Sequence, residues 1–315
     1  MKLPIPWIEL VEKYLAYRRS FGFELTSEEI VLRQFGKFAS IKHDQEHLTV
    51  ELAVAWARAS KRQSPITWAR RIEVLRGFAK YLQRFDNETQ IPQRDLFGPS
   101  HQRLVPHIYT DEELSALLDA TKLLLPLQGL RPATCRAVFG LLAATGLRIS
   151  EAVNLNRADF DSTLHLLHIR DGKFHKERWV PIHPSVTKSL CSYETLRDRI
   201  VQKPRSAHFF LLDNGAPANR RGIHYALGVI CQHLGWEPQG DYKRHRLHDF
   251  RHTFIVRSVL RSYEAGRAPD QAVASISTYV GHAKIADTYW YFTATPELMS
   301  IAAGRFHNYY QEGAK

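Results

Sequence analysis

Residues 144–152 read Ala-Thr-Gly-Leu-Arg-Ile-Ser-Glu-Ala and join two predicted helices. Upstream, the apolar run over 133–144 predicts a buried helix that ends near Gly146, because glycine commonly terminates helices. Downstream, the pattern over 149–155 predicts a second helical stretch. The segment therefore belongs to an α-rich part of the chain.

Further along, the pattern changes to short strands. Two strands are predicted over 164–169 and 178–182, around a polar segment in which Asp171-Gly172 is a hairpin signal. From about Ala218 onward the sequence is mostly helical again. Upstream, Thr110 can cap a helix whose first turn is acidic, so we expect the second domain to open there.

The first hundred residues predict a small all-α unit of four helices. The apolar positions at helical spacing are Trp7, Val11, Tyr14 and Leu15 in the first helix, and Ile30, Leu32, Phe35 and Phe38 in the second. The third helix is predicted over about 48–60. The fourth has Ser64 as its N-cap and Pro65 at its first position, and runs to Leu82.

The length of 315 residues favours two domains. Between Thr89 and Pro106 the helical pattern lapses into Gln, Pro, Gly, Ser and His, which indicates a linker. The predicted boundaries are a helical domain over 1–88, a linker over 89–106 and a second domain over 107–315.

The composition describes a soluble protein with an anionic partner. There are 43 Lys and Arg against 32 Asp and Glu, a net charge of +11, which favours nucleic acid or an anionic membrane surface. No run approaches the roughly 20 apolar residues of a membrane span, and the first residues lack the apolar core of a signal peptide. We therefore expect a cytoplasmic protein, without a membrane partner, whose three cysteines are reduced thiols.

One stretch of the first domain is strongly basic. Between Trp56 and Arg84, eight basic residues are opposed only by Glu73: Arg58, Lys61, Arg62, Arg70, Arg71, Arg76, Lys80 and Arg84. On a helix, Arg58, Lys61 and Arg62 would share a face and could meet a row of phosphates. A solvated helix surface explains the same charges, so this stretch alone leaves both interpretations open.

The sequence lacks the motifs of nucleotide and metal chemistry. It contains no phosphate-binding loop, no dinucleotide fingerprint after a strand and no His-Glu-x-x-His or Cys-x-x-Cys pair. A site could be assembled on paper from Cys231, His233, His245, His248 and His252, but this spacing matches no regular zinc pattern. We therefore predict neither a metal nor another cofactor.

The pentapeptide His248-Asp249-Phe250-Arg251-His252 suggests phosphodiester chemistry. On a helix, the first, fourth and fifth residues project from one face and place an imidazole beside a guanidinium. Arginine can stabilise the charge of a five-coordinate phosphoryl transition state, and histidine can move protons near neutral pH. Taken by itself, the pentapeptide is better explained as a helix cap beside a salt bridge.

Together, five segments in this order resemble the signature of the tyrosine recombinases, the phage integrase family. They are Ala144-Thr145-Gly146-Leu147-Arg148-Ile149-Ser150-Glu151-Ala152, Gly172-Lys173, Leu247-His248-Asp249-Phe250-Arg251-His252-Thr253-Phe254, Gly281-His282 and Tyr291. The resemblance covers roughly 107–310, and more loosely the N-terminal helices. It implies a mainly α fold: a four-helix, SAM-like core-binding domain and an α-rich catalytic domain with a small antiparallel sheet.

The resemblance also implies a role for each matched residue. Arg148 and Arg251 would grip the scissile phosphate, and His282 would hydrogen-bond to it. Lys173 would protonate the departing 5′ oxygen, with Lys176 as a competing candidate, and His248 would serve the nucleophile as acid or base. Glu151, three residues after Arg148, would orient other groups of the site.

Tyr291 would be the nucleophile and would form a 3′-phosphotyrosine, which conserves the bond energy so that religation needs neither ATP nor metal. Tyr289 is its rival. Because two residues on a helix differ by about 200° of rotation, only one of them can face the phosphate, and the nine-residue gap from His282 that resembles the family selects Tyr291. An amphipathic helix over 296–312 would dock on a neighbouring subunit or on its own domain.

The function implied is site-specific recombination of double-stranded DNA through a Holliday junction. The enzyme would act as a homotetramer on two sites, either alone or together with other recombinases of the same element. No arm-binding domain precedes the four helices, so the chain resembles simple recombinases of mobile elements. One departure is the segment 262–277, which is more polar and slightly longer than the family pattern. The alternatives are a type IB topoisomerase, a DNA-binding regulator without catalysis and a metal-dependent nuclease.

Overall fold

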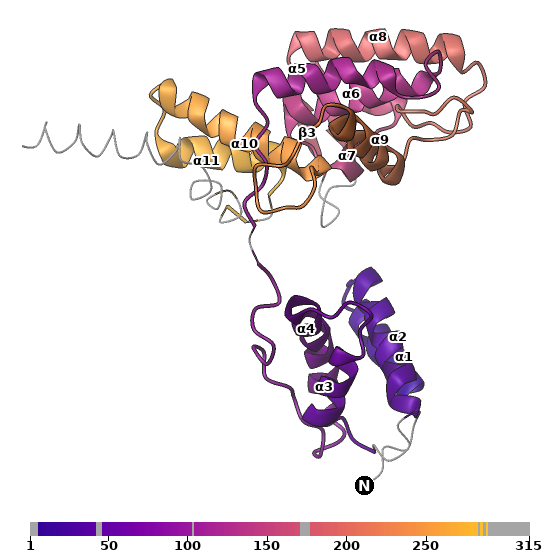
Figure 1. Ribbon diagram of the computed structural model, residues 1–315, viewed down its shortest axis with the longest axis vertical. Coiled ribbons are helices and arrows are strands. Elements are labelled where there is room, and N and C mark those ends of the chain that lie inside the picture. The colour runs from indigo at the N-terminus through magenta and orange to yellow at the C-terminus, as the bar shows by residue number, and fades with distance from the viewer. Residues whose placement is uncertain are drawn as a thin grey trace, which may run out of the picture. The chain divides into compact units, whose positions relative to one another are not determined.

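The computed structural model describes residues 6–41, 46–102, 104–170, 177–282, 284–285 and 288. The chain divides into two compact units, Met1–Arg103 and Leu104–Lys315, each with its own hydrophobic core. Figure 1 shows the elements of each unit. None of the helices in the described ranges is long and apolar enough to cross a membrane.

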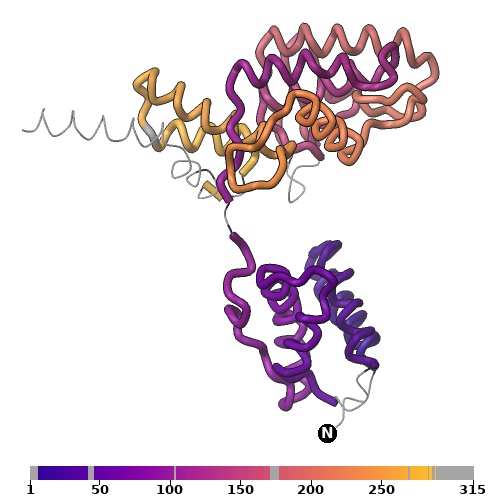
Figure 2. Tube along the Cα trace, in the orientation of Figure 1, coloured from indigo at the N-terminus to yellow at the C-terminus, as the bar shows by residue number. Residues whose placement is uncertain are grey.

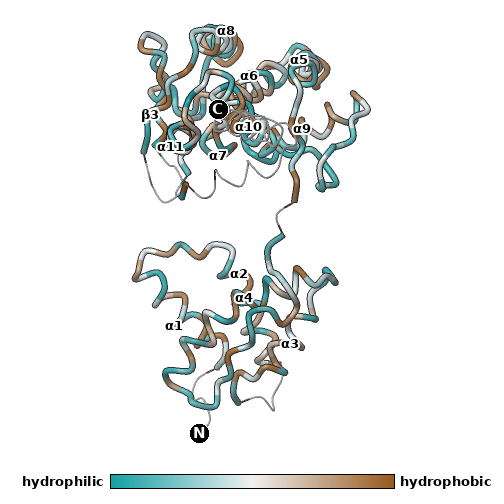
Figure 3. Tube along the Cα trace, turned by 90° about the vertical axis from the view of Figure 1, so that its left-hand side faces the viewer, coloured by the Kyte–Doolittle hydropathy of each residue, from teal (hydrophilic) through white to brown (hydrophobic). Residues whose placement is uncertain are grey.

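The described residues of the first unit form four helices, as predicted. They are α1 (Trp7–Arg19), α2 (Thr26–Ile41), α3 (Val50–Arg58) and α4 (Pro65–Leu82). Ser64 caps α4 by accepting a hydrogen bond from the backbone N–H of Thr67, and Pro65 opens the helix. Figure 3 shows brown and teal positions interleaved along these helices, because each has an apolar and a polar face.

The core of this unit is aromatic. Phe35 makes edge-on ring contacts with Trp7, Trp56 and Phe78, at centroid distances between 5.2 and 6.1 Å. Ile30 differs from the prediction, since 59% of its surface is exposed. The buried face of α2 consists instead of Leu32, Phe35, Gly36 and Ala39.

The segment after α4 runs back along that helix (Figure 2). Arg70 Nε donates to the carbonyl of Ser100 at 2.9 Å, and Phe97 packs edge-on against Trp68 at 5.4 Å. Arg76 donates to the carbonyl of Pro92. Much of the stretch predicted as a linker is therefore packed against the first unit.

The second unit is also mainly helical. Its α-helices are α5 (Asp111–Ala120), α6 (Leu130–Thr145), α7 (Ile149–Val153), α8 (Pro184–Ile200), α9 (Arg220–His233), α10 (Leu247–Glu264) and α11 (Pro269–Val280). Short 3₁₀ helices cover Thr121–Leu123 and Arg157–Asp159. Thr110 caps α5, as predicted, and the structure adds a complete capping box with Glu113. The buried helix α6 packs against α5, α8 and α10 (Figure 1).

A three-stranded antiparallel sheet is embedded among these helices. Its order is β1 (Phe160–Asp161), β2 (Leu166–Ile169) and β3 (Arg178–Pro181). The second and third strands match the prediction, while β1 carries too short a pattern to be recognised. The predicted hairpin turn at Asp171-Gly172 lies outside the described residues. The mainly α fold with a small antiparallel sheet is confirmed.

Candidate active site

The predicted site residues of the second unit that the structure describes lie where four helix ends meet: Arg148, Glu151, His248, Arg251 and His282. Helix α6 ends at Gly146, which adopts the left-handed conformation with φ of +61°. A Cβ there would lie 2.6 Å from a ring carbon of Phe254, so both conformation and space require glycine. This turn places Arg148 at the N-cap of α7, near the first residues of α10 and the last residues of α11.

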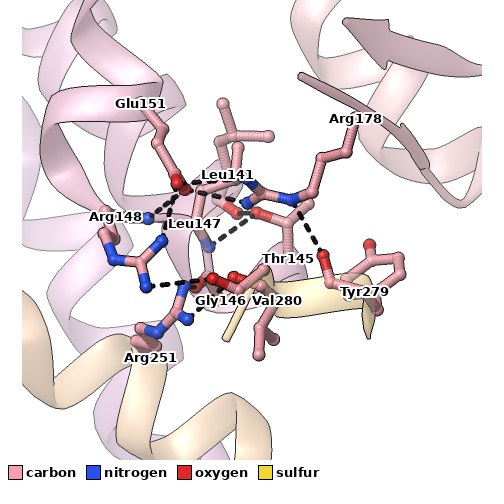
Figure 4. A network of polar contacts seen from close by, with 11 residues as sticks. Leu141, Thr145, Gly146, Leu147, Arg148, Glu151, Arg178, Arg251, Tyr279 and Val280 are labelled. Carbon is pink, nitrogen blue, oxygen red and sulfur yellow. Dashed lines mark hydrogen bonds and ion pairs between the residues drawn. The ribbon is translucent and has the colours of Figure 1, made fainter. Parts of the chain in front are cut away.

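Glu151 is the anionic centre of the network in Figure 4. Its buried carboxylate accepts the backbone N–H of Arg148 at 2.9 Å and the guanidinium Nη1 of Arg148 at 2.8 Å. Arg178 adds two parallel bonds, at 3.1 and 2.9 Å. Burial alone would raise the pKa of Glu151, but the hydrogen bonds and charges of Arg178 and Arg148 lower it. One carboxylate thus orients two arginines.

Arg251 is held differently, although it carries the same charge. Its side chain is almost completely buried, and its two Nη groups donate to the carbonyls of Gly146 at 2.8 Å and Val280 at 2.7 Å. Both carbonyls belong to helix C-terminal ends, where backbone oxygens lack helical partners. The orientation of this guanidinium is therefore fixed by the meeting of α6, α10 and α11 (Figure 4).

The end of α11 completes the arrangement. Gly281 has φ of +68°, its carbonyl accepts Nη2 of Arg148 at 3.1 Å, and a Cβ there would lie 2.9 Å from Cζ of Arg178. His282 follows directly, and its Nδ1 lies 2.7 Å from Oγ1 of Thr288. The structure therefore brings Arg148, Glu151, Arg251 and the Gly281-His282 pair together.

His248 lies among these cations, at the start of α10. Desolvation by the surrounding protein and the positive charges of Arg251, Arg246 and Arg148 lower its pKa. His248 is also exposed to water, which weakens the desolvation. The positive charges of the neighbouring arginines still lower its pKa. The ring of His252 lies edge-on to that of His248, with 4.6 Å between the ring centroids. Burial is the main cause that lowers the pKa of His252, to about 2. At neutral pH, His248 is a neutral imidazole that can accept a proton.

Several predicted site residues lie outside the described residues: Lys173, Lys176, Tyr289, Tyr291 and the helix over 296–312. The strands β2 and β3 flank the segment that carries both lysines. Among the described residues, no group of histidine, cysteine and acidic side chains is arranged to hold a metal ion.

The basic residues of the first unit differ in their exposure to solvent. Arg58, Lys61, Arg62 and Arg70 are exposed. Arg71 is half-buried, with its guanidinium 4.1 Å from the ring centroid of Trp56. The prediction that Arg58, Lys61 and Arg62 share a helix face is wrong. Helix α3 ends at Arg58, and Lys61 and Arg62 lie in the turn before Ser64.

Sequence reasoning missed Arg178, which is as central to the network as Arg148. Besides its bonds to Glu151, its Nε donates to the carbonyl of Tyr279 at 3.1 Å. A signal was available, since Arg178 shares a strand face with the buried Val180. An arginine on the inward face of a strand requires a buried acid.

Comparison with known proteins agrees with this geometry. The phage integrase family matches residues 108–297. A putative integrase/recombinase of Sinorhizobium fredii, y4rB, is 36% identical over 309 residues, covering 96% of this chain and 98% of the relative. The tyrosine recombinase XerC of Herpetosiphon aurantiacus is 28% identical, covering 83% and 78%.

Solved structures share the fold. The Tn1549 transposon integrase in complex with transposon right end DNA has a TM-score of 0.66 at 18% identity, covering 95% of this chain and 99% of that one. XerH bound to its palindromic difH substrate has a TM-score of 0.65 at 17% identity, covering 90% and 80%. The extent of the family match and the identity to y4rB confirm the predicted family and enzyme class: this chain belongs to the phage integrase family and is a tyrosine recombinase.

Proposed function

We propose that this recombinase cleaves and rejoins double-stranded DNA at specific sites through a 3′-phosphotyrosine on Tyr291, with neither metal nor ATP. The observation that supports this most is the pair of guanidiniums of Arg148 and Arg251, fixed at one place beside a neutral His248. A phosphodiester under attack gains negative charge on its non-bridging oxygens. Preoriented cations stabilise that charge without reorganising during the reaction.

The two arginines would divide this task. The side chain of Arg148 retains 23% exposure, so its guanidinium can reach a phosphate while Glu151 holds its other side. Arg251 is buried, and its two carbonyl acceptors fix the plane of its guanidinium. Its charge acts through a region of low dielectric, where the electrostatic interaction is strong. His282 would donate a hydrogen bond to the same phosphate.

Proton transfers accompany the exchange of bonds at phosphorus. His248 would accept the proton of the Tyr291 hydroxyl as the Tyr291 oxygen–phosphorus bond forms and the bond from phosphorus to the 5′ oxygen breaks. Lys173, with Lys176 as its rival, would give a proton to the departing 5′ oxygen. One phosphodiester replaces another, so the reverse attack by a 5′ hydroxyl reseals DNA without an outside energy source.

We further propose that the helical domain over 1–88 and the catalytic domain over 107–315, joined through 89–106, clamp a duplex. Arg58, Lys61, Arg62 and Arg70 are exposed and can meet phosphates, whereas Arg71 is half-buried against Trp56 and would contribute less. The names of the structural relatives support a DNA substrate, since they describe complexes with transposon, difH and core-site DNA. Four protomers on two sites would exchange strands through a Holliday junction, with the helix over 296–312 docked on a neighbour.

The test is covalent trapping on nicked DNA. The full chain is incubated with nicked duplexes that tile the DNA on both sides of its gene, and the products are separated on denaturing gels. We expect a protein–DNA adduct at the 3′ end of the cleaved strand, unaffected by chelator and lost in Tyr291→Phe. The matched control Tyr289→Phe should retain it. An undiminished adduct in Tyr291→Phe would contradict the assignment of the nucleophile.

Further assays on the same purified protein distinguish the other candidate activities. Relaxation of supercoiled plasmid without a specific site would indicate a type IB topoisomerase. Shifts of duplex DNA on native gels without cleavage of any substrate would indicate a regulator. Cleavage that chelator abolishes would indicate a metal-dependent nuclease.

A further inference from the structure

Arg246 caps helix α10 in the same manner as Arg148 caps α7. The carboxylate of Asp249 accepts the backbone N–H of Arg246 on one oxygen at 2.7 Å, and Nε and Nη2 of its guanidinium on the other at 3.0 and 2.6 Å. At α7, one oxygen of Glu151 likewise takes the backbone N–H of Arg148 and the other takes its guanidinium. The two helices begin with the same arginine–acid box.

The two boxes also match in burial. The side chains of Arg148 and Arg246 retain 23% and 24% exposure, while their acids retain 1% each. In both, the acid is enclosed and the guanidinium has one side open to solvent. A buried carboxylate that fixes an arginine from behind is an arrangement suited to presenting it to an anion in front.

Arg246 has hydrogen-bonding capacity left on that open side. Its Nη1 makes no hydrogen bond to any residue that the structure describes, whereas both Nη groups of Arg148 are engaged. The ring of Tyr242 lies against the guanidinium, with its centroid 3.2 Å from Cζ. This stacking holds the guanidinium plane from a second direction.

Arg246 also lies close to the proposed chemistry. It is two residues before His248, and its positive charge contributes to lowering the pKa of both His248 and His252. The cation is therefore near the group that faces the proposed phosphate.

We infer that Arg246 is a further DNA-binding residue of the active site, which donates from Nη1 to a backbone phosphate beside the one that Arg148 and Arg251 hold. This inference rests on the proposed function, since it takes DNA as the substrate. Asp249 is then a positioning residue for Arg246, as Glu151 is for Arg148. The two boxes would hold neighbouring phosphates of one strand.

The test measures DNA binding in a background that cannot cleave. The full chain with Tyr291→Phe is titrated with a 30-base-pair duplex of random sequence at several salt concentrations. Replacing Arg246 and its acid together, R246Q/D249N, avoids leaving a buried carboxylate unpaired, and an asparagine at 249 can still accept the cap N–H. We expect about tenfold weaker binding and a log–log salt slope smaller by about 0.9, the value of one phosphate contact.

Two further variants separate binding from folding. Arg246→Lys keeps the charge without the fork, so it should retain the salt slope while losing part of the affinity. The matched control is Arg257→Gln on the same helix, whose guanidinium pairs with Asp111 and donates to the carbonyl of Tyr109 at 2.9 Å. It should lower the melting temperature of the chain and leave the slope unchanged.

The outcomes are distinguishable from those of the adduct experiment. A double variant that melts at the temperature of the parent chain and keeps its salt slope would overturn the role of Arg246 while leaving the recombinase mechanism intact. If the wild-type chain forms no adduct but R246Q/D249N still has a smaller salt slope of DNA binding, the proposed cleavage is wrong and the DNA contact of Arg246 is supported.

Discussion

Two ion pairs of nearly equal geometry have different surroundings in the two units. In the first unit, Arg33 donates two hydrogen bonds to Glu12, at 2.7 and 3.1 Å. In the second, Arg178 donates two to Glu151, at 3.1 and 2.9 Å. The side chains of the first pair are 49% and 44% exposed, and those of the second 15% and 1%. Burial, and not bond geometry, decides what each pair can contribute.

The same difference separates the basic residues of the two units. Most of those proposed to bind DNA in the first unit are exposed, so water screens each charge and any one can be lost without breaking a network. Around Glu151, each cation shares an acceptor or a helix end with another. A change there alters the position of several groups at once.

The comparison is tested most severely by Arg251→Lys. The lysine keeps the charge but lacks the planar fork whose two Nη groups donate to the carbonyls of Gly146 and Val280, so the charge is no longer held in one orientation. We expect the rate of adduct formation on bound DNA to fall about 10²–10³-fold, the usual cost of losing one preoriented donor. Arg62→Ala is the control from the first unit. It should leave that rate unchanged, and an equal fall in both variants would remove the distinction.

The two ion pairs themselves provide the next test. Glu151→Gln removes the buried anion that Arg148 and Arg178 share. We expect the free energy of unfolding, measured with denaturant, to fall by about 3–5 kcal/mol. Glu12→Gln removes the exposed counterpart and should change the unfolding midpoint little. If the two substitutions cost the same, burial does not account for the contrast.

A third test uses pH. Burial lowers the pKa of His245 to about 4 and that of His252 to about 2, from an ordinary value of 6.5. His245 faces His107 and Glu113, while His252 faces His248, His282 and the guanidiniums of Arg246 and Arg251. As the pH falls below 6.5 the unfolded chain takes up protons that the folded chain does not, so the second unit loses stability.

Between pH 7.5 and 5.5, each of these histidines should cost on the order of 1 kcal/mol. His252→Asn should make the loss of stability with falling pH shallower, as followed by thermal unfolding at each pH. A loss of stability between pH 7.5 and 5.5 that is as steep in His252→Asn as in the wild-type chain would contradict this prediction.

The smallest effects should distinguish basic residues within the first unit. Arg71 is half-buried against Trp56, and burial lowers its pKa. Arg71→Ala should therefore lower stability by about 1 kcal/mol and leave the salt dependence of DNA binding nearly unchanged. Arg62→Ala should do the reverse, reducing the slope by about 0.9 without altering the melting temperature. Equal slopes in both variants would mean that Arg62 is merely solvated.

Features that depend on residues close together in the sequence could be predicted, and features that depend on residues far apart could not. Ser64 and Thr110 cap helices through bonds to residues three positions away, so their roles are legible in the sequence. The end of α3 was misjudged, because the turn through residues 59–63 competes with helix continuation and no strong breaker marks it. Arg178 was missed because its acid is 27 residues away.

The sequence by itself determined the helices, the strands β2 and β3 and the family of the enzyme, because spacing, caps and ordered motifs are properties of the chain alone. Only the tertiary structure decided which carbonyls hold Arg251 and that Arg178 shares Glu151 with Arg148. These depend on helix ends and side chains meeting across up to about a hundred residues. The free energy of such contacts depends on burial, which the packed fold alone supplies.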